Sequence, residues 1–177
     1  MIISVEDAKT LLGDVKGWTD ERLSRKLKAI EDVIRSYTNN NFQNRGYRKT
    51  ADIVGGLFIN EALTPFVVGD TVQIHDSAYN DGIYTIISAD ETTFSMLETV
   101  KDERNVLVTR VDYPEAVKDC ALNLLEWEIK HRDKVGIQSE TLSRHSVTYF
   151  AQDASNQIMG YPASLLGCLK AYKKARF

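Results

Sequence analysis

Three consecutive residues, His75-Asp76-Ser77, contain the side-chain types of a hydrolytic catalytic triad. They fall at the end of a predicted β-strand. Successive residues of a strand point to opposite faces, so three neighbouring positions cannot align there as nucleophile, base and orienting acid. The tripeptide therefore gives little support for catalysis.

A second candidate is the pair Glu128 and His131, which has the spacing of one half of a carboxylate-bundle metal site. Such a site also needs a second pair and two carboxylates from facing helices, and the other predicted helices contain no histidine. Glu128 falls within the apolar arc of its own predicted helix, where a carboxylate is costly without a partner. We expect Glu128 either to pair with a base inside the helical domain, which we favour, or to face a neighbouring subunit.

The two cysteines, Cys120 and Cys168, lie inside apolar helical patterns. They are predicted to be reduced core thiols of a protein made in the cytosol, rather than a disulfide or a metal-binding pair. The sequence contains no phosphate-binding loop, Gly-x-Gly-x-x-Gly, His-Glu-x-x-His or Cys-x-x-Cys motif. We therefore predict a protein that is not an enzyme and that binds no cofactor or metal.

Composition is that of an ordinary globular protein, with 27% charged and 43% hydrophobic residues, a net charge of −3 and a pI of about 5.7. This balance does not support a dedicated nucleic-acid binder. Residues 66–111 contain eight acidic and three basic side chains, which would repel phosphate. The sequence has no apolar run near the ~20 residues needed to span a bilayer and no basic N-terminal secretion signal, so no membrane partner is expected.

Helical periodicity appears at both ends of the chain. Ser4 and Thr19 are predicted N-caps of a short first helix and a long second helix, which ends at Thr38 and the asparagines that follow it. Tyr113-Pro114 begins a central helix whose wide apolar arc predicts cover by other helices. Tyr161-Pro162 is predicted to begin a last helix.

Between these helices, residues 42–112 read as five or six short strands with turn signals, including Gly55-Gly56 and Asn80-Asp81-Gly82. Such a series predicts a small barrel or a strongly bent antiparallel sheet. The predicted fold class is therefore α+β: a small bundle of about four helices from residues 1–41 and 113–177, with residues 42–112 as an inserted β module.

Two C-terminal features are predicted to contact partners. Residues 137–160 form a long polar stretch that we expect to be mobile in a free subunit and ordered in an assembly, anchored by Val147, Tyr149 and Phe150. The predicted last helix carries a basic cluster with no acidic residue nearby. The members of this cluster are Lys170, Lys173, Lys174 and Arg176.

The order of these segments resembles the head–tail connector (adaptor, or head completion) proteins of long-tailed bacteriophages. The likeness covers the short helix from Ser4, the long helix that ends at residues 37–42, the Tyr113-Pro114 helix, the segment 136–149 with its Ser-Glu-Thr-Leu-Ser sequence, and the Leu-rich basic end. The β module departs from compact connectors, which pass almost directly from the second helix to the third. Residues 68–74 and 79–86 look like a small barrel seen in several phage proteins.

The resemblance implies a non-enzymatic structural protein of the virion neck, made in the bacterial host cytoplasm. It implies a ring of identical subunits, dodecameric on the portal, that contacts the portal protein and a downstream head-completion or tail protein. DNA would pass through this ring without sequence-specific binding. The basic cluster is then expected to face the portal, with passing DNA as the alternative target. An independent nucleic-acid- or protein-binding module built on the small barrel is the alternative function.

Overall fold

The computed structural model describes residues 1–13, 15, 17–60, 66–132, 139–142, 145–148 and 156–175. The chain forms two compact units, and each is described by itself. The first comprises Met1 and Asn41–Tyr113, and the second comprises Ile2–Asn40 and Pro114–Phe177. The β unit is therefore inserted in sequence between two stretches of the helical unit.

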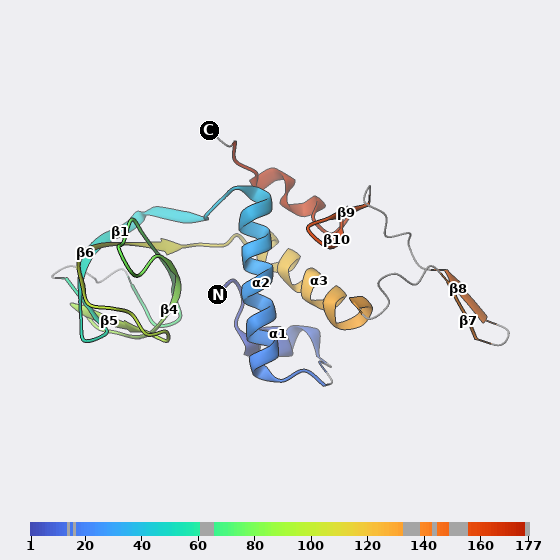
Figure 1. Ribbon diagram of the computed structural model, residues 1–177, viewed down its shortest axis with the longest axis horizontal. Helices are drawn as coiled ribbons and strands as arrows, with labels where there is room; N and C mark the ends of the chain where they lie inside the picture. The colour runs from blue at the N-terminus through green and yellow to red at the C-terminus, as the bar shows by residue number, and fades with distance from the viewer. Residues whose placement is uncertain are drawn as a thin grey trace. The chain divides into compact units, whose positions relative to one another are not determined.

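The β unit is a closed antiparallel barrel (Figure 1). Its strand order is β1-β2-β5-β4-β3-β6. Strands β6 and β1 pair with each other, which closes the barrel and leaves no free edge. The strands are β1 (Gln43–Val54), β2 (Leu57–Ile59), β3 (Thr71–His75), β4 (Gly82–Ala89), β5 (Thr93–Met96) and β6 (Glu103–Val111).

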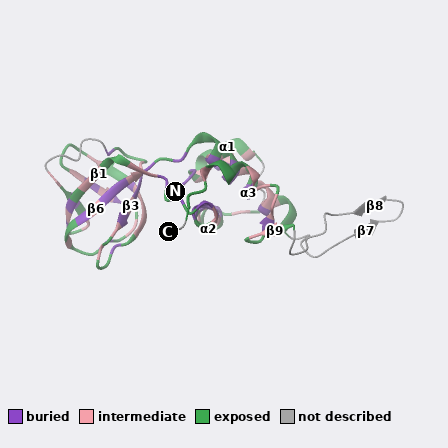
Figure 2. Ribbon diagram, turned by 90° about the horizontal axis from the view of Figure 1, so that it is seen from above, coloured by how far each residue is buried: buried purple, intermediate pink, exposed green. Residues whose placement is uncertain are grey.

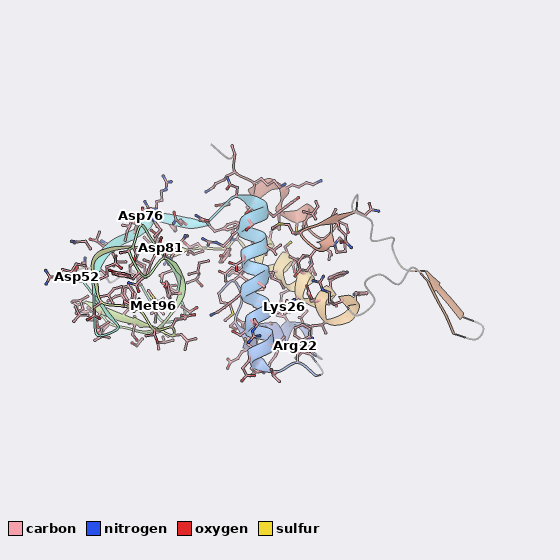
Figure 3. All side chains as sticks on the ribbon, in the orientation of Figure 1. Arg22, Lys26, Asp52, Asp76, Asp81 and Met96 are labelled. Carbon is pink, nitrogen blue, oxygen red and sulfur yellow. The ribbon has the colours of Figure 1, made fainter. Side chains whose placement is uncertain are left out.

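Local sequence explains the barrel's turns and its interior. Gly55 and Gly56 both have positive φ angles, 59° and 82°, as the tight two-residue turn between β1 and β2 requires. Alternating residues point inward, and Phe58 and Phe94 stack at 4.6 Å between ring centroids. Met96, labelled in Figure 3, belongs to the same buried cluster. The predicted two-glycine hairpin is confirmed.

The barrel begins and ends at adjacent points of the chain. Gln43 in β1 lies opposite Val111 in β6, and the Asp112 amide donates a hydrogen bond to the Phe42 carbonyl at 3.0 Å. The Phe42 and Tyr113 rings are 5.0 Å apart. Neighbouring entry and exit points allow a compact unit to be inserted into another without stretching it.

The helical unit contains α1 (Val5–Leu12), α2 (Asp20–Thr38) and α3 (Glu115–His131). The predicted caps are confirmed, because Ser4 accepts a hydrogen bond from the Asp7 amide and Thr19 accepts one from the Arg22 amide. Asn39, in the left-handed conformation with φ 49°, ends α2.

Helices α2 and α3 pack against each other, and the buried residues on both are coloured purple in Figure 2. They lie at intervals of three and four residues on both helices, which gives each an apolar face toward the unit's interior. Helix α2 buries Leu23, Leu27, Ile30 and Ile34, and α3 buries Val117, Cys120, Ala121, Leu124 and Leu125.

The predicted bundle of about four helices is wrong, although the α+β class holds. The predicted C-terminal helix is replaced by two short paired strands, β9 (Gln157–Ile158) and β10 (Tyr161–Pro162), and by a 3-10 helix, η2 (Gly167–Tyr172). Met159 and Gly160 have positive φ angles and form the turn between the strands. Among its described residues, the helical unit therefore has two long helices, one short helix and a 3-10 helix, which do not make a connector-like bundle.

The physical reason for this difference is local geometry. Tyr161 and Pro162 are held extended by pairing with β9, so an α-helix cannot begin at these residues. The amides that follow bond three residues back, as from Leu169 to the Leu166 carbonyl at 3.2 Å. Leu166 and Leu169 are nevertheless fully buried. The apolar pattern therefore correctly predicted a buried segment, but not that it is a 3-10 helix.

Strands β7 (Ser139–Leu142) and β8 (His145–Thr148) form a separate two-stranded hairpin. Its register places Glu140 opposite Val147. Within the segment predicted to order on assembly, these two strands and residues 156–160 are described. The predicted anchors Tyr149 and Phe150 lie outside the described residues.

Candidate functional site

Glu128 is the most buried carboxylate of α3, with 3% of its surface exposed. It occupies the same face as Leu124 and Leu125, one turn before the helix ends. Its carboxylate Oε2 lies 3.2 Å from Lys26 Nζ of α2 and 3.5 Å from Arg132 Nε at the end of α3. Figure 3 labels Lys26 on α2. The two cations supply the charge that a buried carboxylate needs.

Aromatic and backbone groups complete the surroundings of Glu128. The Trp127 and Tyr161 rings are 5.5 Å apart, and the Arg132 guanidinium lies 5.5 Å from the Trp127 ring. Arg132 also donates a hydrogen bond to the Gly160 carbonyl at 3.1 Å. Burial, and then the hydrogen bond with the Glu128 carboxylate, raises the pKa of the Tyr161 hydroxyl. The cluster therefore connects α2, α3 and the β9–β10 turn.

The metal interpretation of Glu128 and His131 gains no support from this geometry. Glu128 is buried and ion-paired, whereas His131 is exposed at the end of α3. Among the described residues, no group of three or more His, Cys, Asp or Glu side chains has an arrangement that could hold a metal ion. The Glu128 cluster is best understood as an electrostatic connection between helices.

His75, Asp76 and Ser77 are only partly brought together. His75 Nδ1 lies 2.9 Å from Asp76 Oδ2, because Asp76 follows β3 in a left-handed conformation with φ 60°. Asp76 lies just after β3, so the alternation of strand residues does not apply to it. The Ser77 hydroxyl donates instead to Glu103 Oε2 at 2.5 Å. Ser77 thus fastens a loop to β6 and is not hydrogen-bonded to the imidazole.

Three members of the basic cluster, Lys170, Lys173 and Lys174, are exposed. Arg176, the fourth, lies outside the described residues. The segment that carries them is fixed to the end of α2, because the Lys174 amide donates to the Thr38 carbonyl at 2.8 Å. Lys173 Nζ also lies 3.7 Å from the centre of the Tyr37 ring. Lys173 thus lies beside the last turn of α2, at the negative end of its dipole, and the exposed lysines also form a positive surface.

A pair of exposed apolar residues on the outside of the barrel was not predicted from the sequence. Leu57 and Ile59 of β2 point outward, opposite Ser95 and Thr93 of β5. Ser95 continues the row to Ser88 of β4, with a 2.7 Å hydrogen bond between their hydroxyls. Alternation in β2 indicated that one set of residues faces outward, but the barrel's closure decided that this set is Leu57 and Ile59.

Cysteine placement also differs from the prediction. Cys120 is a buried core thiol of α3, as predicted, but Cys168 in η2 is exposed. The helical pattern that placed Cys168 in the core does not apply to a 3-10 helix, whose residues repeat every three positions.

No protein-family model matches this sequence, and a search of curated proteins finds no match. Among the described residues, no helix is both long enough and apolar enough to cross a membrane.

Proposed function

We propose that this protein is a structural subunit of a bacteriophage neck, forming a ring that joins the portal to the tail and continues the DNA channel. The proposal combines the segment order described above with a capped helical unit. The inserted unit is a closed barrel, so it offers no free strand edge to which another chain could add a strand. No catalytic role is proposed for any residue.

The observation that carries the proposal is the β7–β8 hairpin. Within the described part of the chain, these strands pair only with each other. An isolated two-stranded hairpin is marginally stable in water, and a neighbouring chain can stabilise it by adding a strand or a packed surface. A subunit that carries such an element is suited to assembly with copies of itself or with the portal.

The test is assembly with and without the hairpin. Purified protein is mixed with portal rings, and particle mass and negative-stain images are recorded. We expect added rings with the natural chain and none when residues 139–148 are replaced by a Gly/Ser linker of equal length. A chain that remains a monomer even with portal present would contradict the proposal, whereas a monomer alone would not.

Point variants in β8 give a sharper comparison. Val147→Asp is expected to weaken ring formation, and Ser146→Asp is the matched control at a neighbouring position of the same strand. Neighbouring positions of a strand alternate between its two faces, so equal charges are introduced in two different environments. Hydrogen exchange adds a second measurement, because we expect protection of residues 137–160 to increase on assembly. Strong protection in the isolated monomer would contradict this expectation.

A second candidate function is a protein-binding module on the barrel. It is favoured by the outward apolar residues Leu57 and Ile59, which are 44% and 42% exposed. Leu57 lies in a row with Ser95 and Ser88, and Ile59 lies between Asp52 and Thr93. The acidic balance of residues 66–111 opposes nucleic acid as the ligand. Leu57→Lys with Ile59→Lys would abolish binding of a barrel partner but leave ring formation through the hairpin unchanged.

A further inference from the structure

Cys120 and Cys168 are brought to one point of the helical unit by different elements, α3 and η2. The two thiols share an acceptor: Cys120 Sγ lies 3.3 Å and Cys168 Sγ 3.4 Å from the Leu165 carbonyl oxygen. The Cys120 thiol also hydrogen-bonds with the Cys168 side chain, so the two sulfurs are neighbours, as a disulfide between them would require.

The two thiols differ in access, which gives them different roles. Cys168 is exposed, so a soluble oxidant can reach its sulfur. Cys120 is buried within the core, so an oxidant cannot reach it directly. An accessible cysteine beside a second, protected cysteine is the usual arrangement of an oxidation-sensitive thiol and its resolving partner.

We propose that Cys120 and Cys168 form an oxidation site in which an intramolecular disulfide closes between α3 and η2. A peroxide first oxidises Cys168 to a sulfenic acid and is itself reduced, releasing water. The Cys120 thiol then loses its proton, and its sulfur attacks the Cys168 sulfur. Hydroxide leaves and combines with that proton as a second water, so two thiols and one peroxide give one disulfide and two waters.

The disulfide would fix the basic C-terminal segment to the helical core. Residues 172–175 already bond to the end of α2, where the Asn40 amide group donates to the Tyr172 carbonyl at 3.2 Å and the Asn39 amide group donates to the Ala175 carbonyl at 3.0 Å. A covalent bond at Cys168 adds a constraint immediately before these contacts. The pair is a dithiol in a reducing compartment and a disulfide in an oxidising one. This inference is independent of the neck-ring function.

The pH dependence of closure is set by Cys120. Burial, followed by the hydrogen bond with Cys168, raises the pKa of the Cys120 thiol. The attacking species is the thiolate, and below its pKa the thiolate fraction rises about tenfold for each pH unit. Closure after sulfenic acid formation should therefore accelerate about tenfold per unit between neutral and mildly alkaline pH.

The experiment treats the reduced full-length chain with hydrogen peroxide, blocks remaining thiols with N-ethylmaleimide and determines intact mass and cross-linked peptides. We expect loss of two hydrogen atoms, a Cys120–Cys168 peptide and a rise of about 5–10 °C in Tm that a reductant reverses. Cys120→Ala should instead accumulate a Cys168 sulfenic acid that dimedone traps. Circular dichroism checks that this variant remains folded.

Three outcomes would overturn the proposal. One is oxidation of Cys168 to sulfinic acid in the natural chain while Cys120 stays reduced. Another is a disulfide that forms only between two chains. The third is equal dimedone labelling of the natural chain and Cys120→Ala, which would show that Cys120 does not resolve the sulfenic acid. Cys168→Ser, at the exposed position, should form neither product and serves as the matched control.

Discussion

At the scale of single residues, the informative side chains are buried or half-buried acids with defined partners. Glu128 lies within reach of Lys26 and Arg132, which connects two helices. Glu103 accepts hydrogen bonds from the Ser77 hydroxyl and the Ala78 amide, which fastens a barrel loop. Both carboxylates have structural consequences that can be measured.

Replacing Lys26 alone should destabilise the helical unit more than replacing Lys26 and Glu128 together. Lys26→Met leaves the Glu128 carboxylate buried with one cation fewer, a loss of about 1–3 kcal/mol in the free energy of unfolding. Adding Glu128→Leu removes the buried charge as well, and replacing a buried pair by apolar residues is often nearly neutral. Urea unfolding of the two single variants and the double variant gives the coupling energy. Strictly additive losses would contradict the proposed connection.

Glu103 predicts a pH effect on barrel stability. Hydrogen bonds, first from Ser77 and then from the Ala78 amide, lower the pKa of Glu103 from its ordinary value of 4.5. A carboxylate with a lowered folded pKa contributes stability above its unfolded pKa and loses it as pH falls through the folded value. Glu103→Gln should therefore flatten the acid side of the stability profile measured by denaturant midpoint. Glu91→Gln, at an exposed barrel position, should leave the profile unchanged.

At the scale of elements, the C-terminal segment both attaches to the end of α2 and carries exposed lysines. Its backbone is bonded to the end of α2, and its lysines form an exposed positive surface. Lys173 additionally packs on the Tyr37 ring. Its charge is therefore partly used within the unit, and Lys170 and Lys174 are the better candidates for a partner surface.

Neutralising the basic cluster is expected to affect attachment more than folding. Lys170→Gln, Lys174→Gln and Arg176→Gln together should weaken attachment to portal and reduce its salt sensitivity, because fewer charges are screened. Lys173→Gln alone is the comparison and should cost about 0.5–1 kcal/mol of stability through its ring contact. Binding is measured at two salt concentrations. Normal portal attachment with altered DNA retention would assign these charges to the channel.

At the scale of the whole molecule, the two units have separate cores. The barrel core is built from residues 51–108, and the helical core comes from α1, α2, α3 and the C-terminal segment. Because the barrel's first and last strands are paired neighbours, its removal leaves chain ends that a short linker can join.

Replacing residues 42–112 by a short Gly/Ser linker should therefore preserve cooperative unfolding of the helical unit. Thermal unfolding followed by helical circular dichroism is the measurement, with a Tm change of no more than a few degrees expected. The barrel expressed alone, as residues 41–113, should give a separate strand-rich transition. Complete loss of cooperative helical unfolding would mean that the two units fold and unfold together as one cooperative unit.

The sequence by itself determined the elements whose signals are local. The caps at Ser4 and Thr19 and the Gly55-Gly56 turn depend on neighbouring residues, and all three were predicted correctly. Only the tertiary structure decided the rest. Pairing with β9 overrode the helical pattern at Tyr161, and barrel closure selected the outward set on β2. Periodicity indicated that Glu128 needs a basic partner, but only packing between residues distant in sequence determined that Lys26 is one and that Cys168 lies beside Cys120.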